Sequence, residues 1–211
     1  GTATSPIPYP LYIARTGDAT PKIQPIVAAP TPFVGPKVGG VESFYVAIGT
    51  GKYLESGDNI STTQQGFYVV YDNGSTAADS SPIASAISGR GRLAAGTVNT
   101  TTRTVTVNAF KWGRPASNTD TTQRAGWYFD LPDSGERIDQ AALNVGSLYA
   151  AVNSKIPGST AAGAGSCTNT LGGGNQYFLN INNGSGTYTP STMGLLGQPV
   201  MLTSDDETVV S

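Results

Sequence analysis

The fold is decided by residues 42–73, whose sequence is ESFYVAIGTGKYLESGDNISTTQQGFYVVYDN. Two short apolar runs in this stretch, residues 44–48 and 67–71, are rich in aromatic and β-branched residues and are bounded by Gly, Asp and Asn, which indicates strands. Neither run has a polar face. Because successive side chains of a strand point to opposite faces, both faces must be covered, and we expect two inner strands of a stacked-sheet protein. The polar connection, residues 49–66, is predicted to be a surface loop, where binding residues commonly lie.

The composition of the 211 residues favours many short strands separated by turns. Gly (27) and Pro (14) are abundant, and only 12% of the residues are charged. The formal net charge is −2 with no basic cluster, so we expect no nucleic-acid partner. There is no His, the commonest general base and metal ligand, which argues against most hydrolytic and zinc mechanisms. No run approaches ~18 apolar residues, so no membrane insertion is expected.

Further runs with strand character are distributed along the whole chain. We expect strands at residues 11–15, 23–28, 92–98, 103–109, 126–131, 136–140, 147–153, 176–182, 187–189 and 199–203. The Pro-rich residues 29–40 are expected to form a connection, because Pro cannot donate to a central ladder. Strict alternation over residues 103–109 predicts a hairpin with residues 92–98 that has one wet face, hence an outer or edge pair.

These ten or so strands predict an all-β fold, either a propeller or a sandwich. A capping Ser81 before Pro82 predicts at most one short helix, over residues 81–87. We expect a single domain over residues 1–211, with residues 1–10 as an extended arm and residues 157–174 as a Gly/Ala/Ser-rich loop. Because the chain starts at Gly1, it is interpreted as a processed or excised piece of a longer protein.

Several motifs that suggest chemistry have simpler structural explanations. The single cysteine, Cys167, excludes a disulfide within the chain and is interpreted as a small buried side chain, or as one that pairs with a partner chain. Residues 49–52 are similar to the end of a phosphate loop, but Tyr53 stands where Ser or Thr is required, so a turn is favoured. The carboxylates of residues 130, 133 and 136 could serve a glycosidase or a cation site, although turn and cap roles are favoured.

The candidate binding residues lie in the 49–66 loop and beside it. Tyr68 and Trp127 belong to predicted inner strands and are expected in the core, whereas Tyr53 and Trp112 flank loops and could contact a ligand. The polar loop itself adds a cation and a carboxylate. The candidate binding residues are therefore Lys52, Tyr53, Asp58 and Trp112.

Three stretches resemble a known family when they are taken together and in order. They are residues 24–30 (QPIVAAP), residues 48–58 (IGTGKYLESGD) and residues 126–137 (GWYFDLPDSGER). They resemble the C-terminal β-propeller of the PilY/PilC family of type IV pilus-associated adhesins, and the resemblance spans most of residues 11–203. A single Cys167 within a Gly/Ser-rich loop before a strand agrees with that layout.

The resemblance implies part of a β-propeller-like stack of antiparallel sheets in a non-enzymatic bacterial protein that is extracellular or at the cell surface. It implies roles in surface attachment and pilus biogenesis, with other protein chains as partners, either pilus subunits or copies of this chain. The family's calcium loop of alternating Asp residues is not present in this sequence, so no cofactor is expected.

Two alternatives to a pilus-tip adhesin follow from the same sequence. Part of a propeller would leave apolar blade faces and strand edges uncovered, so the chain could self-assemble into an extracellular filament or tube. The second alternative is an enzyme, such as a propeller hydrolase or a quinoprotein-like dehydrogenase. It is opposed by the absence of His and would require a cluster of carboxylates in an apolar pocket.

Overall fold

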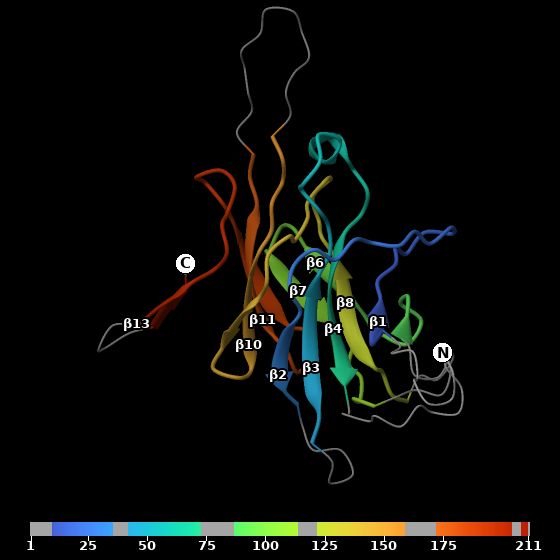
Figure 1. Ribbon diagram of the computed structural model, residues 1–211. Helices are drawn as coiled ribbons and strands as arrows, with labels where there is room; N and C mark the ends of the chain where they lie inside the picture. The colour runs from blue at the N-terminus through green and yellow to red at the C-terminus, as the bar shows by residue number, and fades with distance from the viewer. Residues whose placement is uncertain are drawn as a thin grey trace, which may run out of the picture.

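The computed structural model describes residues 10–35, 42–72, 87–113, 122–158, 172–203 and 208–210, and these are all-β apart from one 3-10 turn, η1 (Asp58–Ile60) (Figure 1). The strands are β1 (Tyr12–Ile13), β2 (Thr31–Val34), β3 (Phe44–Gly49), β4 (Gly66–Asp72), β5 (Ile87–Ser88), β6 (Ala94–Asn99), β7 (Thr104–Val107), β8 (Gly126–Asp130), β9 (Leu143–Val145), β10 (Tyr149–Asn153), β11 (Asn175–Asn180), β12 (Gly186–Pro190), β13 (Met201–Thr203) and β14 (Thr208–Val210).

Ten of these strands form one sheet that curls into a nearly closed barrel. Their order is β2-β3-β4-β8-β6-β7-β12-β11-β10-β9, and every pair is antiparallel except β6 with β8. The two ends of the sheet approach each other, since the Thr31 hydroxyl at the start of β2 donates to the Ala142 carbonyl just before β9 over 2.9 Å. The curl places one face of the strands around a common interior, to which every strand of this sheet except β9 contributes buried side chains.

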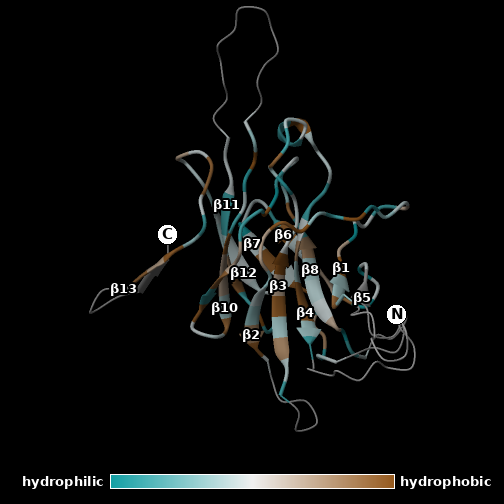
Figure 2. Ribbon diagram, viewed as in Figure 1, coloured by the Kyte–Doolittle hydropathy of each residue, from teal (hydrophilic) through white to brown (hydrophobic). Residues whose placement is uncertain are grey.

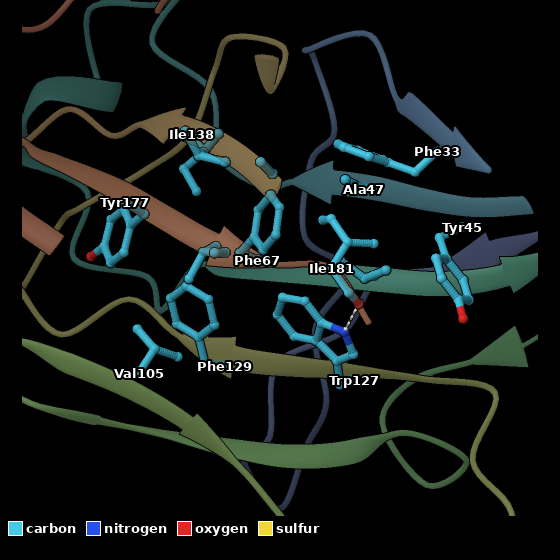
Figure 3. Packing of buried hydrophobic residues seen from close by; sticks show 14 of the residues in the cluster. Phe33, Tyr45, Ala47, Phe67, Val105, Trp127, Phe129, Ile138, Tyr177 and Ile181 are labelled. Atoms are coloured by element: carbon cyan, nitrogen blue, oxygen red, sulfur yellow. Dashed lines mark hydrogen bonds between the residues drawn. The ribbon is translucent and has the colours of Figure 1, made fainter. Parts of the chain in front are cut away.

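The interior of the barrel is filled with aromatic rings. Trp127 on β8 is fully buried, and its ring centroid lies 5.8 Å from that of Phe67 and 6.4 Å from that of Phe129 (Figure 3). The indole Nε1 of Trp127 donates to the Ile181 carbonyl over 2.8 Å, which satisfies its one polar atom. Trp127 was expected in the core, and the structure confirms this. Among the described residues, the curled sheet encloses its large apolar face within a single copy, while β2 and β9 remain at the two ends of the sheet.

The two runs that decided the fold are inner strands, as predicted. β3 and β4 pair along their whole length, from Phe44 with Asp72 to Gly49 with Phe67, and hydrophobic residues mark β3 in Figure 2. On β4, Phe67 and Val69 face the barrel interior, while Tyr68 and Val70 belong to a second buried cluster on the outer face. The lack of a polar face in the sequence of β4 is therefore explained by the burial of both faces of this strand.

The N-terminal segment, residues 10–26, covers the outer face of β4. Tyr12 on β1 packs against Tyr68 with ring centroids 5.1 Å apart, and Ala14 and Leu93 are buried in the same cluster. Tyr68 donates its hydroxyl hydrogen to the Gln24 side chain. Tyr68 was expected in the core, and it is fully buried between the barrel and this segment.

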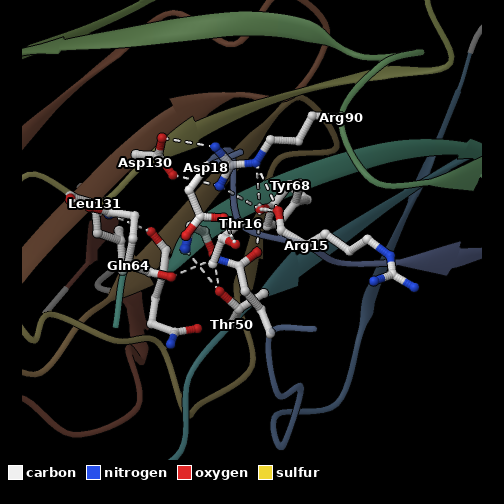
Figure 4. Close-up of polar contacts among 12 residues, drawn as sticks. Arg15, Thr16, Asp18, Thr50, Gln64, Tyr68, Arg90, Asp130 and Leu131 are labelled. Atoms are coloured by element: carbon white, nitrogen blue, oxygen red, sulfur yellow. Dashed lines mark hydrogen bonds and ion pairs between the residues drawn. The ribbon is translucent and has the colours of Figure 1, made fainter. Parts of the chain in front are cut away.

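Arg90 joins the N-terminal segment to the sheet (Figure 4). Its Nη1 and Nη2 donate to the two carboxylate oxygens of Asp130 over 2.9 and 2.6 Å, and its Nε donates to the Arg15 carbonyl over 2.9 Å. Its Nη2 also donates to the Tyr68 hydroxyl over 2.9 Å, and its guanidinium carbon lies 4.6 Å from the Tyr128 ring centroid. The guanidinium thus binds three segments that are far apart in the sequence.

The structure corrects three strand predictions. Residues 23–28 form no strand; they make only isolated bridges to Arg15 and Gly51, because Pro25 interrupts the run of backbone donors. Residues 136–140 likewise make a single bridge, from Arg137 to Lys155. Conversely, β2 lies inside the predicted Pro-rich connection. β2 is an edge strand that pairs only with β3, so a proline is tolerated there.

The hairpin of residues 92–98 and 103–109 is confirmed as β6 and β7, but its predicted edge position is wrong. β6 pairs with β8 and β7 pairs with β12, so both strands lie inside the sheet. The alternation reported a wet face correctly, since the Thr97 and Thr106 hydroxyls are 3.1 Å apart on an exposed face. A wet face does not exclude strand partners on both sides.

Other predictions fall at or beyond the limits of the described residues. The tight turn after β11 is confirmed, with Gly184 at φ +72°, and the strand at residues 199–203 is present as β13, although its partner β14 was not predicted. Most of the expected helix, residues 81–86, lies outside the described residues, and residue 87 begins β5 instead. Residues 1–9 of the arm and residues 159–171, with Cys167, also lie outside them.

Candidate functional site

The predicted binding loop between β3 and β4 is organised by a carboxylate that caps its own turn. The Asp58 Oδ2 accepts hydrogen bonds from the backbone N–H groups of Leu54 and Glu55, both over 2.9 Å. These two donors, with the nearby Lys52 ammonium 3.5 Å from Oδ1, lower the pKa of Asp58 below its usual value. Lys52 also pairs with Glu55 over 2.6 Å. Lys52 and Asp58 therefore bind the loop to itself, as an Asx-type turn would.

Arg137 binds the inner side of this loop and connects it to the barrel. It was not among the binding residues predicted from the sequence. Its Nη1 donates to the carbonyls of Lys52 and Asp58 over 2.9 and 2.6 Å, its Nη2 to the Ser61 carbonyl over 3.1 Å, and its Nε to the Gly135 carbonyl over 2.9 Å. Arg137 is only 4% exposed. Four carbonyl oxygens thus surround one buried guanidinium, which supplies the positive charge that orders the loop.

We expect the substitution Arg137→Met to loosen this loop. It removes the donors to four carbonyls while keeping an apolar stem, and it should lower the free energy of unfolding by about 2–3 kcal/mol, measured by urea denaturation. Limited proteolysis should show faster cleavage within residues 52–61. The matched control is Lys52→Met, whose partner Glu55 is 73% exposed and whose loss should change stability by less than about 0.5 kcal/mol. Equal stability of the two variants would contradict the role given to Arg137.

The outward side of the loop carries large apolar side chains among polar ones, which include the exposed Glu55. Leu54 and Ile60 are 75% and 76% exposed, and Tyr53, at 36% exposure, lies with its ring centroid 5.7 Å from the Arg137 guanidinium carbon. A small pocket of about 220 Å³ beneath the loop is lined by Lys52, Asp58 and Arg137, whose polar groups are already engaged within the chain. The loop is therefore suited to contact with another surface more than to enclosing a small molecule.

Trp112, the fourth predicted binding residue, is at a different place. Its ring packs against Tyr45 with centroids 4.2 Å apart and against Phe110 at 4.9 Å, and its Nε1 donates to the Asn182 carbonyl over 2.8 Å. None of these contacts reaches the 49–66 loop. The structure brings Lys52, Tyr53 and Asp58 together with Arg137 and separates Trp112 from them.

The three carboxylates near the 130–136 turn are engaged by different partners. Asp130 is paired with Arg90, whereas Asp133 and Glu136 both accept from the Nδ2 of Asn175 over 2.9 Å. Glu136 is 1% exposed and also accepts from Tyr177 over 2.7 Å and from the Ser154 hydroxyl. The turn and cap interpretation was correct for local contacts such as Asp133 N to Glu136 Oε2 (3.1 Å), but it missed these long-range partners.

Burial raises the pKa of Glu136 above its ordinary value of 4.5, despite the hydrogen bonds that favour its charged form. Between 4.5 and the raised pKa, the unfolded chain releases a proton that the folded chain keeps, so stability decreases as pH rises through this window. We therefore expect the free energy of unfolding of the native chain, relative to Glu136→Gln, to fall with rising pH in urea titrations.

Asp58 is a control for the pH prediction on Glu136, because its pKa is shifted in the opposite direction. Its pKa is lowered from 3.8, so the stability it contributes is present above that value and is lost as pH falls through the folded-state pKa. Relative to Asp58→Asn, the native chain should gain stability with rising pH below about 4. Curves of the same sign for the two variants would disprove the assignments.

The three stretches that carried the family resemblance meet around this loop. The Gly51 N–H donates to the Pro25 carbonyl over 2.8 Å, which joins the first stretch to the second. Arg137, at the end of the third, donates to Lys52 and Asp58 of the second. Residues that are separated in the sequence thus form one junction at the root of the loop.

Comparison with known proteins supports this architecture. The chain matches the crystal structure of the Pseudomonas aeruginosa PilY1 C-terminal domain with a TM-score of 0.58 and 18% sequence identity, over 96% of this chain and 45% of that one. The fold is similar to that of the PilY1 C-terminal domain. This chain therefore spans less than half the length of the PilY1 domain it resembles. No protein-family model and no curated protein matches the chain.

Two further observations concern membranes and metals. Within the described ranges, no helix is long and apolar enough to cross a membrane. In the part of the chain that the structure describes, no group of three or more His, Cys, Asp or Glu side chains is placed to hold a metal ion. The expectation that the chain needs no cofactor stays a prediction.

Proposed function

We propose that this chain is a non-enzymatic binding module of an extracellular protein similar to the PilY/PilC adhesins, which acts with type IV pili in surface attachment and pilus biogenesis. The observation that carries the proposal is the likeness of the fold, and the three family-like stretches of the sequence agree with it. The fold is similar to that of the PilY1 C-terminal domain over 96% of this chain, and the three family-like stretches converge on one junction at the β3–β4 loop.

The loop at this junction offers a surface for a protein partner. Leu54 and Ile60 are exposed at its outside with Tyr53 beside them, next to exposed polar side chains such as Glu55, while Asp58 and Arg137 are engaged within the chain. Such a surface, in which apolar side chains lie among polar ones, suits contact with pilus subunits. Glu136 is 1% exposed and its carboxylate accepts hydrogen bonds from Tyr177, Asn175 and Ser154, which supports a structural role for this residue.

The test is deletion and complementation in the organism that encodes the chain. Removal of the segment should reduce surface pili, counted by electron microscopy, and attachment to abiotic or cell surfaces. Complementation with Leu54→Asp/Ile60→Asp should fail, whereas the control Val34→Asp, at a site 70% exposed and distant in sequence, should restore both. Unchanged pili and attachment after deletion would refute the proposal.

Self-assembly of the chain is the outcome that favours the alternative function. Light scattering and negative-stain images of the purified chain at micromolar concentration distinguish the two. The proposal expects a stable monomer. Regular polymers would support a filament or tube subunit instead.

A further inference from the structure

A groove of about 410 Å³ lies beside Trp112, apart from the 49–66 loop. It runs between the end of β7 and the turn that joins β11 to β12, and its floor and rim include Phe110, Trp112, Asn182, Asn183 and Ser185. Its volume falls within the ~300–1,000 Å³ of small-ligand pockets.

The aromatic side chains of the groove are held rigidly. Trp112 is half-buried, its Nε1 hydrogen is committed to the Asn182 carbonyl, and one side of its ring packs on Tyr45. Phe110, also half-buried, meets it edge to face at an interplanar angle of 65°. The Tyr45 hydroxyl donates to the Asn182 Oδ1 over 3.2 Å, which fixes the rim to the floor. The exposed parts of both rings therefore form a preorganised apolar platform.

The rim beside this platform carries uncharged polar groups. The Asn183 Oδ1 accepts from the backbone N–H and the hydroxyl of Ser185, over 2.9 and 2.7 Å, so the orientation of this exposed amide is fixed. No hydrogen bond joins the Nδ2 of Asn182 or Asn183 to another residue in the described part of the chain. The lining contains no Lys, Arg, Asp or Glu.

We propose that this groove binds a neutral saccharide. A sugar ring presents an apolar C–H face, which packs on an aromatic ring, and hydroxyl groups at its edge, which accept hydrogen bonds from amide N–H groups. The Phe110–Trp112 platform and the Asn182–Asn183 amides provide this pairing side by side, and the uncharged lining matches an uncharged ligand.

A Pro-rich peptide is the other occupant that an aromatic groove can suit. Peptides of this kind dock in aromatic-lined grooves, where a donor to their backbone carbonyls aids recognition. Here the indole Nε1 of Trp112 is already engaged by Asn182, so a saccharide is favoured. The inference goes beyond the proposed function, because saccharide binding requires neither a pilus nor a protein partner.

The chain contains only two tryptophans, which makes the test direct. Trp127 is fully buried, so acrylamide quenching of fluorescence reports Trp112. We expect at least one of lactose, maltose, cellobiose and N,N′-diacetylchitobiose to protect Trp112 from quenching in a saturable way, with a Kd of about 1 mM.

Two variants locate the binding without removing the fold. Asn183→Asp keeps the acceptor for Ser185 but loses the amide donor, and Phe110→Leu keeps apolar volume but loses the ring; each should weaken binding at least about tenfold, or about 1.4 kcal/mol. The matched control Phe178→Leu changes an aromatic residue that is 39% exposed elsewhere and should bind normally.

Several outcomes would overturn the inference. Failure of the whole panel to protect Trp112 in the native chain is one. Equal weakening by Phe178→Leu is another. Protection by a peptide with the sequence of residues 5–10, Ser-Pro-Ile-Pro-Tyr-Pro, but by no saccharide, would assign the groove to Pro-rich peptides instead.

Discussion

Replacing Trp127 by Ala is expected to lower the free energy of unfolding by about 4 kcal/mol, a large share of the ~5–15 kcal/mol that stabilises a typical domain. Trp127 is fully buried in the barrel interior, where it packs against Phe67 and Phe129. The neighbouring strands β4 and β6 cannot move in to fill the space that Ala would leave, because each is paired on both sides. Urea denaturation followed by far-UV circular dichroism measures the change.

The conservative variant separates the two contributions of Trp127. Trp127→Phe keeps much of the ring volume but loses the hydrogen bond to the Ile181 carbonyl, and should cost about 1–2 kcal/mol. Phe178→Ala, at a site 39% exposed on the outer face, should cost less than either. If Trp127→Ala unfolded at the same urea concentration as Phe178→Ala, the barrel interior would not be the core described here.

Gly126→Ala is the second change with a large expected effect, of about 3 kcal/mol. Gly126 begins β8 at φ +154°, and a Cβ placed there would lie 2.0 Å from the Val69 carbonyl oxygen of the neighbouring strand. The obstructing atom is backbone within a paired ladder, so it cannot move aside without disturbing β4 and β8 together. Thermal and urea unfolding should both show the loss.

Gly57→Ala is the matched control for the Gly126 substitution. Gly57 precedes η1 at φ −81°, and an added Cβ there meets nothing within 4 Å. The control should leave stability unchanged or raise it slightly, by up to about 1 kcal/mol, because Ala restricts the unfolded chain. A comparable loss in both variants would mean that β4 and β8 are not in the close register described.

The sequence was most informative about inner strands. The two apolar runs around the 49–66 loop predicted β3 and β4, and the aromatic Trp127 and Tyr68 were placed in the core correctly, because burial on both faces leaves a direct composition signal. The all-β class followed from the same signal. What failed was the position of strands in the sheet: β6 and β7 have a wet face, but their edges are covered by β8 and β12, which are distant in sequence.

The candidate site was predicted in part. Lys52, Tyr53 and Asp58 lie in one loop, as expected, yet the residue that holds the loop, Arg137, was not selected. Its role depends on four backbone carbonyls, and a carbonyl carries no sequence signature. Glu136 was considered among the three carboxylates, but its partners were not predicted, since its donors come from β11 and from the residue after β10. Such partners become visible only when the chain is folded.

The interleaved order of strands in the sheet has a kinetic consequence. β4 can pair with β8 only after residues 126–130 have been synthesised, as in the pairing of Gly66 with Asp130. In the same way, β7 pairs with the much later β12, as in the pairing of Thr104 with Thr187. Such non-local pairings give a high contact order, for which folding times of about milliseconds to seconds are usual. A nascent chain therefore cannot close its barrel until synthesis has passed residue 190. Until then its unpaired strand edges stay open, which favours aggregation.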